Sequence, residues 1–395
     1  MTDKFTPSKE TSHLRAVEMF CGIGGFRLAC EELGIKTVWA NDINPLSCQV
    51  YRHVFGGDEL HEGDIRKLHD TIPSHDILTA GFPCQPFSSA GKKQGTRDAR
   101  GTLFEEIVKV LRAHCPQWFV LENVKRLLTM EQGDHFATIL LALSELDYFV
   151  EWRLLNATYF GLPQNRQRVV IVGTHISDIN EAEISLASVD DLGGAIRRDL
   201  RGLKRYELWR DLSMHRRKFT DWGLCFKGRF HCRNLDTFSN SHPLPTLDAI
   251  LEAAPPSEFY MDETTQERIK SSVFVNRLVE GVRILYNQKG GARMGYTVFG
   301  TDGIAPTLTA SHSRHYERYR VGSRYRRLTH REYARLQGFP DDHCAAASVF
   351  DQYGLYGNAV PPPLAAWAIS RVVLTRGITL DGIEPIPYTQ MSFSL

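Results

Sequence analysis

The 395-residue sequence lacks the long apolar runs from which membrane-spanning helices are built. No run of about 18 apolar residues occurs, and the polar segment from Met1 to His13 does not resemble a signal peptide. It also lacks a charge excess, because 47 Lys and Arg residues against 46 Asp and Glu give a net charge of +1. We therefore expect no membrane segment, while the overall charge neither favours nor excludes a nucleic-acid partner.

Paired cysteine motifs are missing as well. The eight cysteines are scattered, without a CxxC pair or the spacing of a zinc finger. In a chain of this length, such a distribution is typical of reduced thiols in a cytoplasmic protein. His312 and His315 have no matching third and fourth ligands, so we expect no metal site.

Short apolar runs alternate with longer amphipathic stretches between about residues 14 and 175. This alternation predicts an α/β fold with a doubly wound, mostly parallel sheet. The runs predicted as buried strands are residues 16–20, 38–40, 76–80, 119–121 and 169–172. Helical periodicity predicts helices over residues 26–33, 45–55, 103–113 and 135–146, and again over 324–335 and 361–373.

The alternation stops after His175, and residues 177–323 form an irregular stretch with scattered Pro and Gly. Two parts of it are basic: residues 197–233 hold twelve Lys and Arg against four acids, and residues 314–331 hold seven Arg against one Glu. No low-complexity linker separates the parts, so we predict a smaller domain inserted into one fold. The expected divisions are a polar tail at 1–13, a first domain at 14–176, the insertion at 177–323, and a return to the first domain at 324–395.

A glycine turn follows the first predicted strand and opens the first predicted helix. Its glycines, Gly22, Gly24 and Gly25, let the backbone approach a nucleotide-like ligand, and Asp42 at the end of the next strand is placed to bind ribose hydroxyls. A tight turn without a ligand is the alternative. A GxGxxG dinucleotide motif is excluded, because the third glycine is replaced by Arg27.

Three further residues lie where predicted strands end, at the edge where doubly wound folds bind ligands. Cys84, between Pro83 and Pro86, follows one strand in a stiff backbone suited to aiming a thiolate, although a cysteine is more often a small buried hydrophobe. Glu122 ends another strand, where partial desolvation would raise its pKa and let it donate a proton; a solvated acid is the alternative. Asp64 is placed either to meet an adenine amino group or to cap a helix.

The order of the motifs along the chain is specific. The Phe-x-Gly-x-Gly-Gly turn precedes Pro83-Cys84-Gln85, Glu122-Asn123-Val124 and Gln164-Asn165-Arg166-Gln167-Arg168. Further motifs begin at Arg327, Arg335 and Gly357, the last reading Gly-Asn-Ala-Val-Pro-Pro. In this order the sequence resembles the DNA (cytosine-5)-methyltransferase family of the bacterial restriction-modification type. The irregular middle lies where that family has its variable target-recognition domain.

The resemblance implies a covalent mechanism. Cys84 matches the nucleophile that adds to carbon 6 of cytosine, so that carbon 5 can attack the methyl group of S-adenosylmethionine. Glu122 matches the acid that grips ring nitrogen 3, and Arg166 and Arg168 match the arginines that hold the base and the glutamate. A water-derived base would then remove the proton on carbon 5, and Cys84 would be eliminated. The target base must be flipped out of the duplex for this chemistry.

The resemblance also implies binding residues. The expected contacts to S-adenosylmethionine, and to its product S-adenosylhomocysteine, are Phe20, Gly22, Gly24, Asp42, Ile43, Asp64, Ile65 and Pro83, with Asn358 and Val360 closing the methionine side. The family commonly has Glu where this chain has Asp42. The expected contacts to double-stranded DNA are Gln85, Ser88, Thr307, Arg197, Arg198 and Arg201. The polar segment 87–101 suits a loop that closes over the base.

Two alternatives to a site-specific DNA methyltransferase remain. A tRNA cytosine-5 methyltransferase shares the catalytic core, but its typical Cys-Phe-Thr tripeptide is not found in the variable region. A catalytically dead DNA-binding paralogue is opposed by the presence of Cys84, Glu122 and Arg168. We expect a cytoplasmic, DNA-associated monomer, with a cognate restriction endonuclease for the same site as a further partner. Arg331 and Glu332 are expected in scaffold ion pairs, and residues 337–340 as a helix stop.

Overall fold

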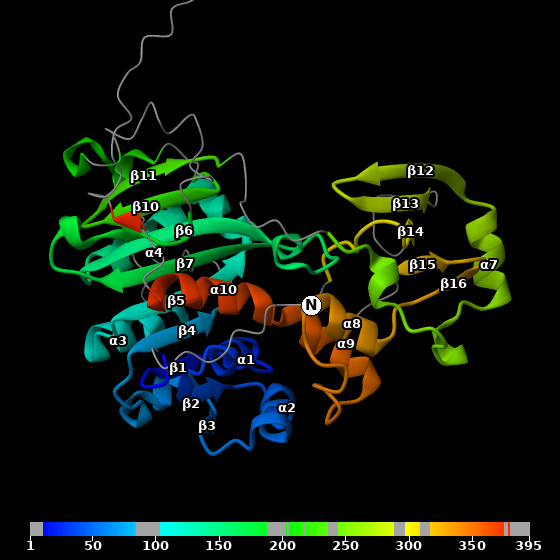
Figure 1. Cartoon of the computed structure of the whole chain (residues 1–395), viewed down its shortest axis with the longest axis horizontal. Helices are drawn as coiled ribbons and strands as arrows, with labels where there is room; N and C mark the ends of the chain where they lie inside the picture. Colours follow the sequence, from blue (N-terminus) through cyan, green and yellow to red (C-terminus); the bar gives the residue numbers. More distant parts are fainter. Residues whose placement is uncertain are drawn as a thin grey trace, which may run out of the picture. The chain divides into compact units, whose positions relative to one another are not determined.

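The computed structural model describes two compact units (Figure 1). The described residues are 11–83, 103–187, 203, 205–215, 219–235, 244–287, 297–308, 317–374 and 378–379. The first unit comprises Met1–Phe82, Leu155–Arg168 and Asn240–Ile369, and the second comprises Pro83–Leu154, Val169–Ser239 and Ser370–Leu395. Among the described residues, no helix has both the length and the apolar character needed to cross a bilayer.

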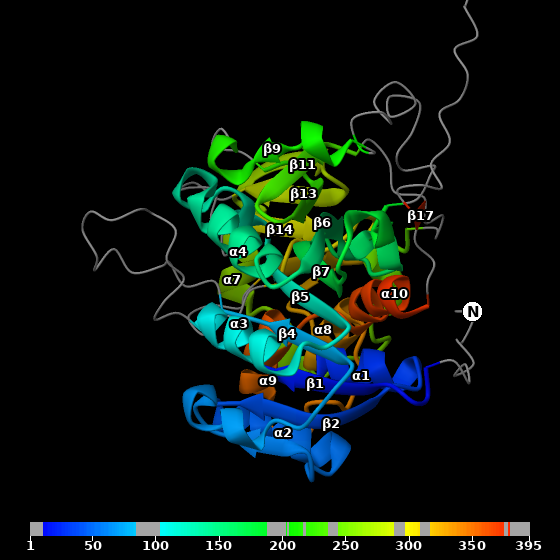
Figure 2. The same ribbon diagram turned by 90° about the vertical axis from the view of Figure 1, so that its left-hand side faces the viewer.

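The first unit begins with a parallel sheet. Its strands lie in the order β3 (Leu60–Glu62), β2 (Lys36–Asp42), β1 (Arg15–Met19) and β4 (Ile77–Gly81). Helix α1 (Gly25–Glu32) connects β1 to β2, and α2 (Pro45–Phe55) connects β2 to β3. Figure 2 shows β1 and β2 running alongside α1 and α2. Because the strands are parallel, their carboxyl ends meet at one edge, where the glycine turn and Asp42 lie.

The same unit holds a five-stranded sheet that the sequence did not predict. Its order is β12 (Val273–Val279), β13 (Val282–Asn287), β14 (Thr297–Gly300), β15 (Arg318–Val321) and β16 (Arg324–Arg326). All pairs are antiparallel except β14 with β15. Helix α7 (Glu263–Lys270) covers one face, where Ile269, Val298 and Tyr325 are buried together. The predicted helix over 324–335 is wrong at its start, because residues 324–326 pair with β15 as a strand.

Three helices complete the first unit's core. They are α8 (His330–Gln337), α9 (Val349–Asn358) and α10 (Pro362–Val373), of which the last turn belongs to the second unit. Thr329 begins α8 with a reciprocal capping box to Glu332, and Gly338 ends it in the left-handed conformation with φ of 79°. The predicted helix stop at 337–340 is therefore confirmed. Tyr333, Phe339 and Tyr356 pack in the core beneath these helices.

The second unit contains a mixed sheet in the order β5 (Trp118–Val124), β7 (Gln167–His175), β6 (Tyr148–Asn156), β10 (Trp222–Phe226), β11 (Arg229–Arg233) and β9 (Arg210–Asp211). Helices α3 (Leu103–His114) and α4 (Asp134–Ser144) precede β5 and β6, and the short strands β8 (Glu183–Ile184) and β17 (Ile378–Thr379) pair separately. The buried Glu151 of β6 accepts the indole N–H of Trp222 at 2.7 Å and the amide of Ser185 at 2.6 Å. Strands β9–β11 thus extend the sheet with residues from the stretch predicted as irregular.

Candidate active site

The three glycines of the β1–α1 turn meet different demands. A β-carbon on Gly24 would lie 2.3 Å from the ring of Phe55, and one on Gly25 would lie 2.3 Å from the carbonyl oxygen of Val360. A β-carbon on Gly22 would meet no atom within 4 Å, although Gly22 has φ of +54°. Gly24 and Gly25 therefore permit close packing, whereas Gly22 borders open space.

Asp42 ties the end of β2 to the glycine turn. Its two carboxylate oxygens accept the amide of Gly22 at 2.8 Å and the amide of Asn44 at 2.8 Å. Burial raises the pKa of Asp42, and these amides oppose the rise. Asn44 in turn caps α2 by accepting amides at its first turn, and the next residue after Asp42, Ile43, is 65% exposed. The acid predicted to bind ribose thus also fixes the local backbone.

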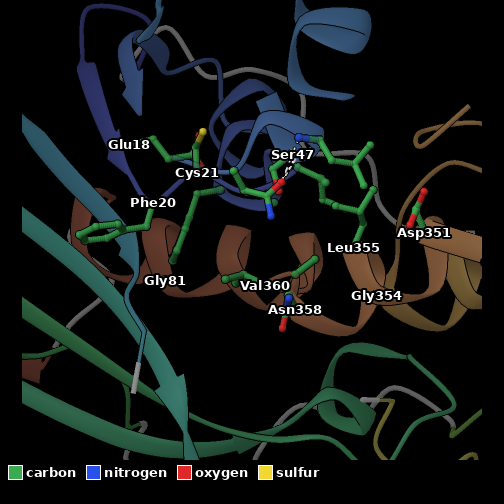
Figure 3. Close-up of a pocket in the computed structure, with 17 residues that line it drawn as sticks. Glu18, Phe20, Cys21, Ser47, Gly81, Asp351, Gly354, Leu355, Asn358 and Val360 are labelled. Carbon is green, nitrogen blue, oxygen red and sulfur yellow. Dashed lines mark hydrogen bonds between the residues drawn. The ribbon is translucent and has the colours of Figure 1, made fainter. Parts of the chain in front are cut away.

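A cavity of about 110 Å³ lies at this edge of the parallel sheet. The residues around it come from the end of β1, the glycine turn, the start of α2, the end of β4 and the end of α9; they include Phe20, Gly22, Ser47, Gly81, Asn358 and Val360 (Figure 3). The structure therefore brings the first predicted motif together with the Gly-Asn-Ala-Val-Pro-Pro motif, more than 300 positions apart in the sequence. This cavity is the strongest candidate ligand site in the described part of the first unit.

Several predicted binding residues lie outside the cavity lining. Gly24 packs against Phe55, and Asp42 reaches the cavity only through its bond to Gly22. Asp64 caps the short 3₁₀ helix Ile65–Lys67 by accepting the amide of Arg66, as one of the two interpretations predicts. Ile65 is buried. An adenine contact at Asp64 stays a prediction.

Glu18 is a lining residue that sequence analysis missed. Its side chain is buried in the middle of β1, and in the described structure neither carboxylate oxygen has a hydrogen-bond partner. Burial raises the pKa of Glu18 to about 8. No sequence signal identified it, because a single acid within an apolar strand gives no indication of which neighbours surround it.

Arg166 joins three distant parts of the chain. This side chain is only 1% exposed, and its guanidinium donates to the carbonyls of Leu308 at 3.2 Å, Gly357 at 3.0 Å and Ala359 at 2.9 Å. Two of these acceptors flank Asn358, which lines the cavity. Arg166 thereby fixes the backbone that carries a predicted cofactor residue.

A second buried residue of the same motif extends this network. Gln164 donates to the carbonyl of Leu336 at 3.1 Å and accepts the amide of Leu308 at 3.1 Å. Gln337, at the end of α8, lies within 3.4 Å of the Gln164 amide nitrogen and donates to the carbonyl of Tyr356. The Gln-Asn-Arg-Gln-Arg motif therefore acts in part as an internal scaffold for the motifs that follow it.

The other predicted catalytic side chains are only partly described. Glu122 lies near the carboxyl end of β5 in the second unit and is buried. Arg168, also buried, donates to the carbonyl of Gln167 at 2.9 Å. The predicted residues Cys84, Gln85, Ser88, Arg197, Arg198 and Arg201, the segment 87–101, and His312 with His315 lie outside the described residues.

A larger cleft of about 510 Å³ lies on the first unit's five-stranded sheet. Its lining includes Arg277, Ile284, Asn287, Phe299 and Thr307. Val298 and Tyr325 belong to the opposite face, which α7 covers. The cleft is thus the uncovered face of this sheet. The hydroxyl of Thr307 donates to the carbonyl of Asn165, beside Arg166, so the cleft adjoins the motif network.

The second basic stretch is partly built into the scaffold. Arg326 and Glu332 form a fully buried, bidentate ion pair with distances of 2.8 and 2.7 Å. Arg331 pairs with Glu252 at 3.4 Å, and Arg324 lies over the ring of Tyr260 at 4.2 Å. The prediction of scaffold ion pairs at Arg331 and Glu332 is confirmed.

Comparisons with known proteins show which family this fold and these motifs represent. The family model described as C-5 cytosine-specific DNA methylase matches residues 14–373. The chain is 30% identical to the type II methyltransferase M.HhaI of Haemophilus parahaemolyticus over 363 residues, covering 89% of this chain and 92% of the relative. It is 32% identical to the type II methyltransferase M1.ScrFI of Lactococcus lactis subsp. cremoris, covering 90% and 77%.

A solved structure supports the fold. The crystal structure of the S. pombe Dnmt2 methyltransferase superposes with a TM-score of 0.60 at 17% identity, covering 92% of this chain and 99% of that one. At this identity the likeness concerns the mixed α/β fold alone. The family match over nearly the whole chain decides the activity: this chain belongs to the C-5 cytosine-specific DNA methylase family, and is a DNA (cytosine-5-)-methyltransferase that uses S-adenosylmethionine.

Proposed function

We propose that the chain methylates one cytosine within a specific duplex sequence, with S-adenosylmethionine held in the cavity beneath the glycine turn. The observation that carries this proposal is the cavity itself, which joins Phe20 and Gly22 to Asn358 and Val360. All four residues match the family's expected cofactor contacts. They come from opposite ends of the chain, so a fortuitous turn between a strand and a helix does not explain them.

The residues present fit this cofactor. The open space at Gly22 lets a ligand approach the backbone closely. Ile43 offers an exposed apolar side chain, suited to a flat base, next to the acid expected at the ribose. The buried carboxyl of Glu18 suits a ligand that carries positive charge. When bound, S-adenosylmethionine supplies the methyl group.

The chain's own residues provide the remaining chemistry. The thiolate of Cys84 forms a bond to carbon 6 of the flipped cytosine, which moves an electron pair toward carbon 5. Glu122 binds ring nitrogen 3 and offsets the charge that develops there. Once carbon 5 carries the methyl group, a water-derived base removes its proton. The carbon–sulfur bond then breaks, which restores the ring double bond and the thiolate.

The two arginines of the motif have separate roles in this proposal. Arg168 holds the base and the glutamate, as the family resemblance implies. Arg166 is a positioning residue, because its guanidinium donates to the carbonyls of Leu308, Gly357 and Ala359. It acts on catalysis through the backbone on either side of Asn358.

Residues 177–323 are proposed as the recognition region, within the catalytic fold of 14–176 and 324–395. The uncovered face of the five-stranded sheet supports this assignment, because its cleft combines Arg277 and Asn287 with Thr307. Arginine and asparagine side chains read guanine and adenine edges in the major groove. Arg197, Arg198 and Arg201 are proposed as phosphate contacts, with Gln85 and Ser88 near the flipped base.

The relatives named as type II methyltransferases support the biological setting. We place the enzyme in the cytoplasm on double-stranded DNA, acting as a monomer, with a cognate restriction endonuclease that cuts the same site. No observation on this chain favours an RNA substrate or a non-catalytic paralogue.

Bisulfite sequencing of plasmid DNA from cells that express the protein tests the activity and finds the site. We expect one recurring sequence with one protected cytosine. Duplex DNA with 5-fluorocytosine at that position should then trap a covalent adduct with the wild type but not with Cys84→Ser. An adduct that forms equally with Cys84→Ser would refute the nucleophile, and methylation of structured RNA in place of DNA would refute the substrate.

A further inference from the structure

The cavity contains one charged group to which the proposed mechanism gives no role. Glu18 lines it from β1, and its side chain is 1% exposed. Within the described residues, both carboxylate oxygens lack a hydrogen-bond partner. Figure 3 shows Glu18 beside Cys21 and Phe20 at the cavity. A buried ionised carboxylate without donors is costly, so this group either stays neutral or awaits a cation.

The surroundings favour the neutral form in the free protein. Burial raises the pKa of Glu18 to about 8, and the negative charge of Asp42 adds to the rise. The guanidinium of Arg27 and the backbone amides of Arg27 and Phe26 at the start of α1 lower the pKa, but do not cancel the effect of burial. The remaining titratable neighbours are Cys21, Cys30 and Tyr51, which burial keeps neutral by raising each pKa.

We propose that Glu18 binds the α-ammonium group of S-adenosylmethionine and loses its own proton when the cofactor enters. The inference rests on the proposed cofactor site. The cofactor carries two cationic groups, a sulfonium and an ammonium. Only the ammonium has N–H donors, and two unpartnered oxygens require donors. The ammonium keeps its protons, and the proton of the carboxyl group passes to solvent.

A capping role for Glu18 is the structural alternative. The amides at the start of α1 face its carboxyl group, and Gly24, the residue before this helix, has no side chain to cap it. A cap would stabilise α1 whether or not the cofactor is bound. It would therefore leave the proton balance of cofactor binding unchanged, which separates the two roles.

The inference predicts how affinity depends on pH. If only the ionised carboxyl receives the ammonium, the competent fraction is about one half at pH 8 and about one hundredth at pH 6. Lowering the pH from 8 to 6 should then weaken binding by up to about 50-fold more in the wild type than in Glu18→Gln. At pH 9, where the wild type is ionised, Glu18→Gln should bind about tenfold more weakly.

Isothermal titration calorimetry of the full chain in buffers of different ionisation enthalpy counts the protons. At pH 7 the wild type should release up to about 0.9 proton more than Glu18→Gln on binding S-adenosylmethionine, and at pH 9.5 almost none. The α-amino group of the ligand also titrates near pH 8, but it does so equally with both proteins. Glu145→Gln removes an exposed carboxyl of the second unit and should behave as the wild type.

S-adenosylhomocysteine separates the two cationic groups, because it keeps the ammonium and lacks the sulfonium. Equal extra proton release with both ligands supports the inference, whereas release with S-adenosylmethionine alone overturns it. If neither ligand binds the wild type, the proposed cofactor site fails. If both bind and wild type and Glu18→Gln release equal numbers of protons, this inference fails while the site stands.

A thermal measurement without ligand checks that the variant folds and that the carboxyl is neutral. In the folded protein Glu18 holds its proton up to about pH 8, whereas in the unfolded chain it loses it near its ordinary value of 4.5. Wild-type stability should therefore fall relative to Glu18→Gln as the pH rises from 4.5 to 8. A wild type that gains stability relative to the variant over this range would overturn the inference.

Discussion

Replacing Gly25 by alanine tests whether packing at the glycine turn positions the last motif. The new β-carbon would lie 2.3 Å from the carbonyl oxygen of Val360 and 3.3 Å from its carbonyl carbon. Ordinary contacts are longer than about 3 Å, so one backbone segment must move by roughly 1 Å, and no flexible side chain can absorb the shift. Overpacking of this kind costs roughly 1–3 kcal/mol. We expect a clear fall in melting temperature together with weaker cofactor binding.

Gly22→Ala is the matched control, because its β-carbon meets nothing within 4 Å. The left-handed backbone costs an alanine about 1–2 kcal/mol, so its melting temperature should fall no more than that of Gly25→Ala. Its methyl group would, however, occupy space proposed for the cofactor, and binding measured by calorimetry should weaken at least tenfold. Wild-type stability of Gly25→Ala would refute the close approach to Val360. Wild-type affinity of Gly22→Ala would refute the cofactor site beside it.

Three further substitutions address other parts of the site and its scaffold. Asp42→Asn should weaken S-adenosylmethionine binding by roughly ten- to a hundredfold, as expected for charge-assisted bonds worth about 1.5–3 kcal/mol, with unchanged calorimetric affinity as the contrary result. Arg166→Met leaves three carbonyls without a donor and should lower stability by about 3 kcal/mol or more in urea unfolding, unlike a residue that only contacts the base. Arg326→Ala leaves Glu332 buried without its cation and should cost about 3–5 kcal/mol, and a loss below about 1 kcal/mol in the same assay would contradict the buried pair.

The parallel part of the fold could be predicted because its signals are local. Helix α2 begins and ends where the periodicity predicts, since Asn44 and Pro45 give the sequence of a capped helix start. The strand predicted over 38–40 proved longer, as β2 (Lys36–Asp42), because a parallel partner on each side recruits polar end residues. Neighbouring residues are sufficient to predict such elements.

The five-stranded sheet could not be predicted in this way. Strand β12 is mostly exposed, with Phe274 and Leu278 both more than half accessible, so it lacks the alternation of a half-buried strand. Its pairing with β13 contains a register shift, with Asn276 at a positive φ, which breaks the period further. Strands β14 and β15 pair in parallel across a long connection. The stretch therefore read as irregular.

The candidate site shows the same division between local and distant information. Asp42 and the glycines are neighbours of a predicted strand end, and the sequence indicates them directly. The role of Glu18 depends on α1, α2 and α9 enclosing one point of β1, and no spacing along the chain expresses that enclosure.

The position of Arg166 affects how loss of activity in this motif should be interpreted. Its guanidinium binds the backbone on either side of Asn358, so removing it disturbs a cofactor residue before any base is bound. An inactive Arg166 variant therefore does not identify a contact to cytosine. Weaker cofactor binding in the absence of DNA would indicate positioning, because the flipped base is not present in that measurement. A variant of Arg168 with unchanged cofactor affinity, full stability and lost adduct formation would instead indicate a direct role at the base. Comparing the two variants separates scaffold from chemistry within a single five-residue motif.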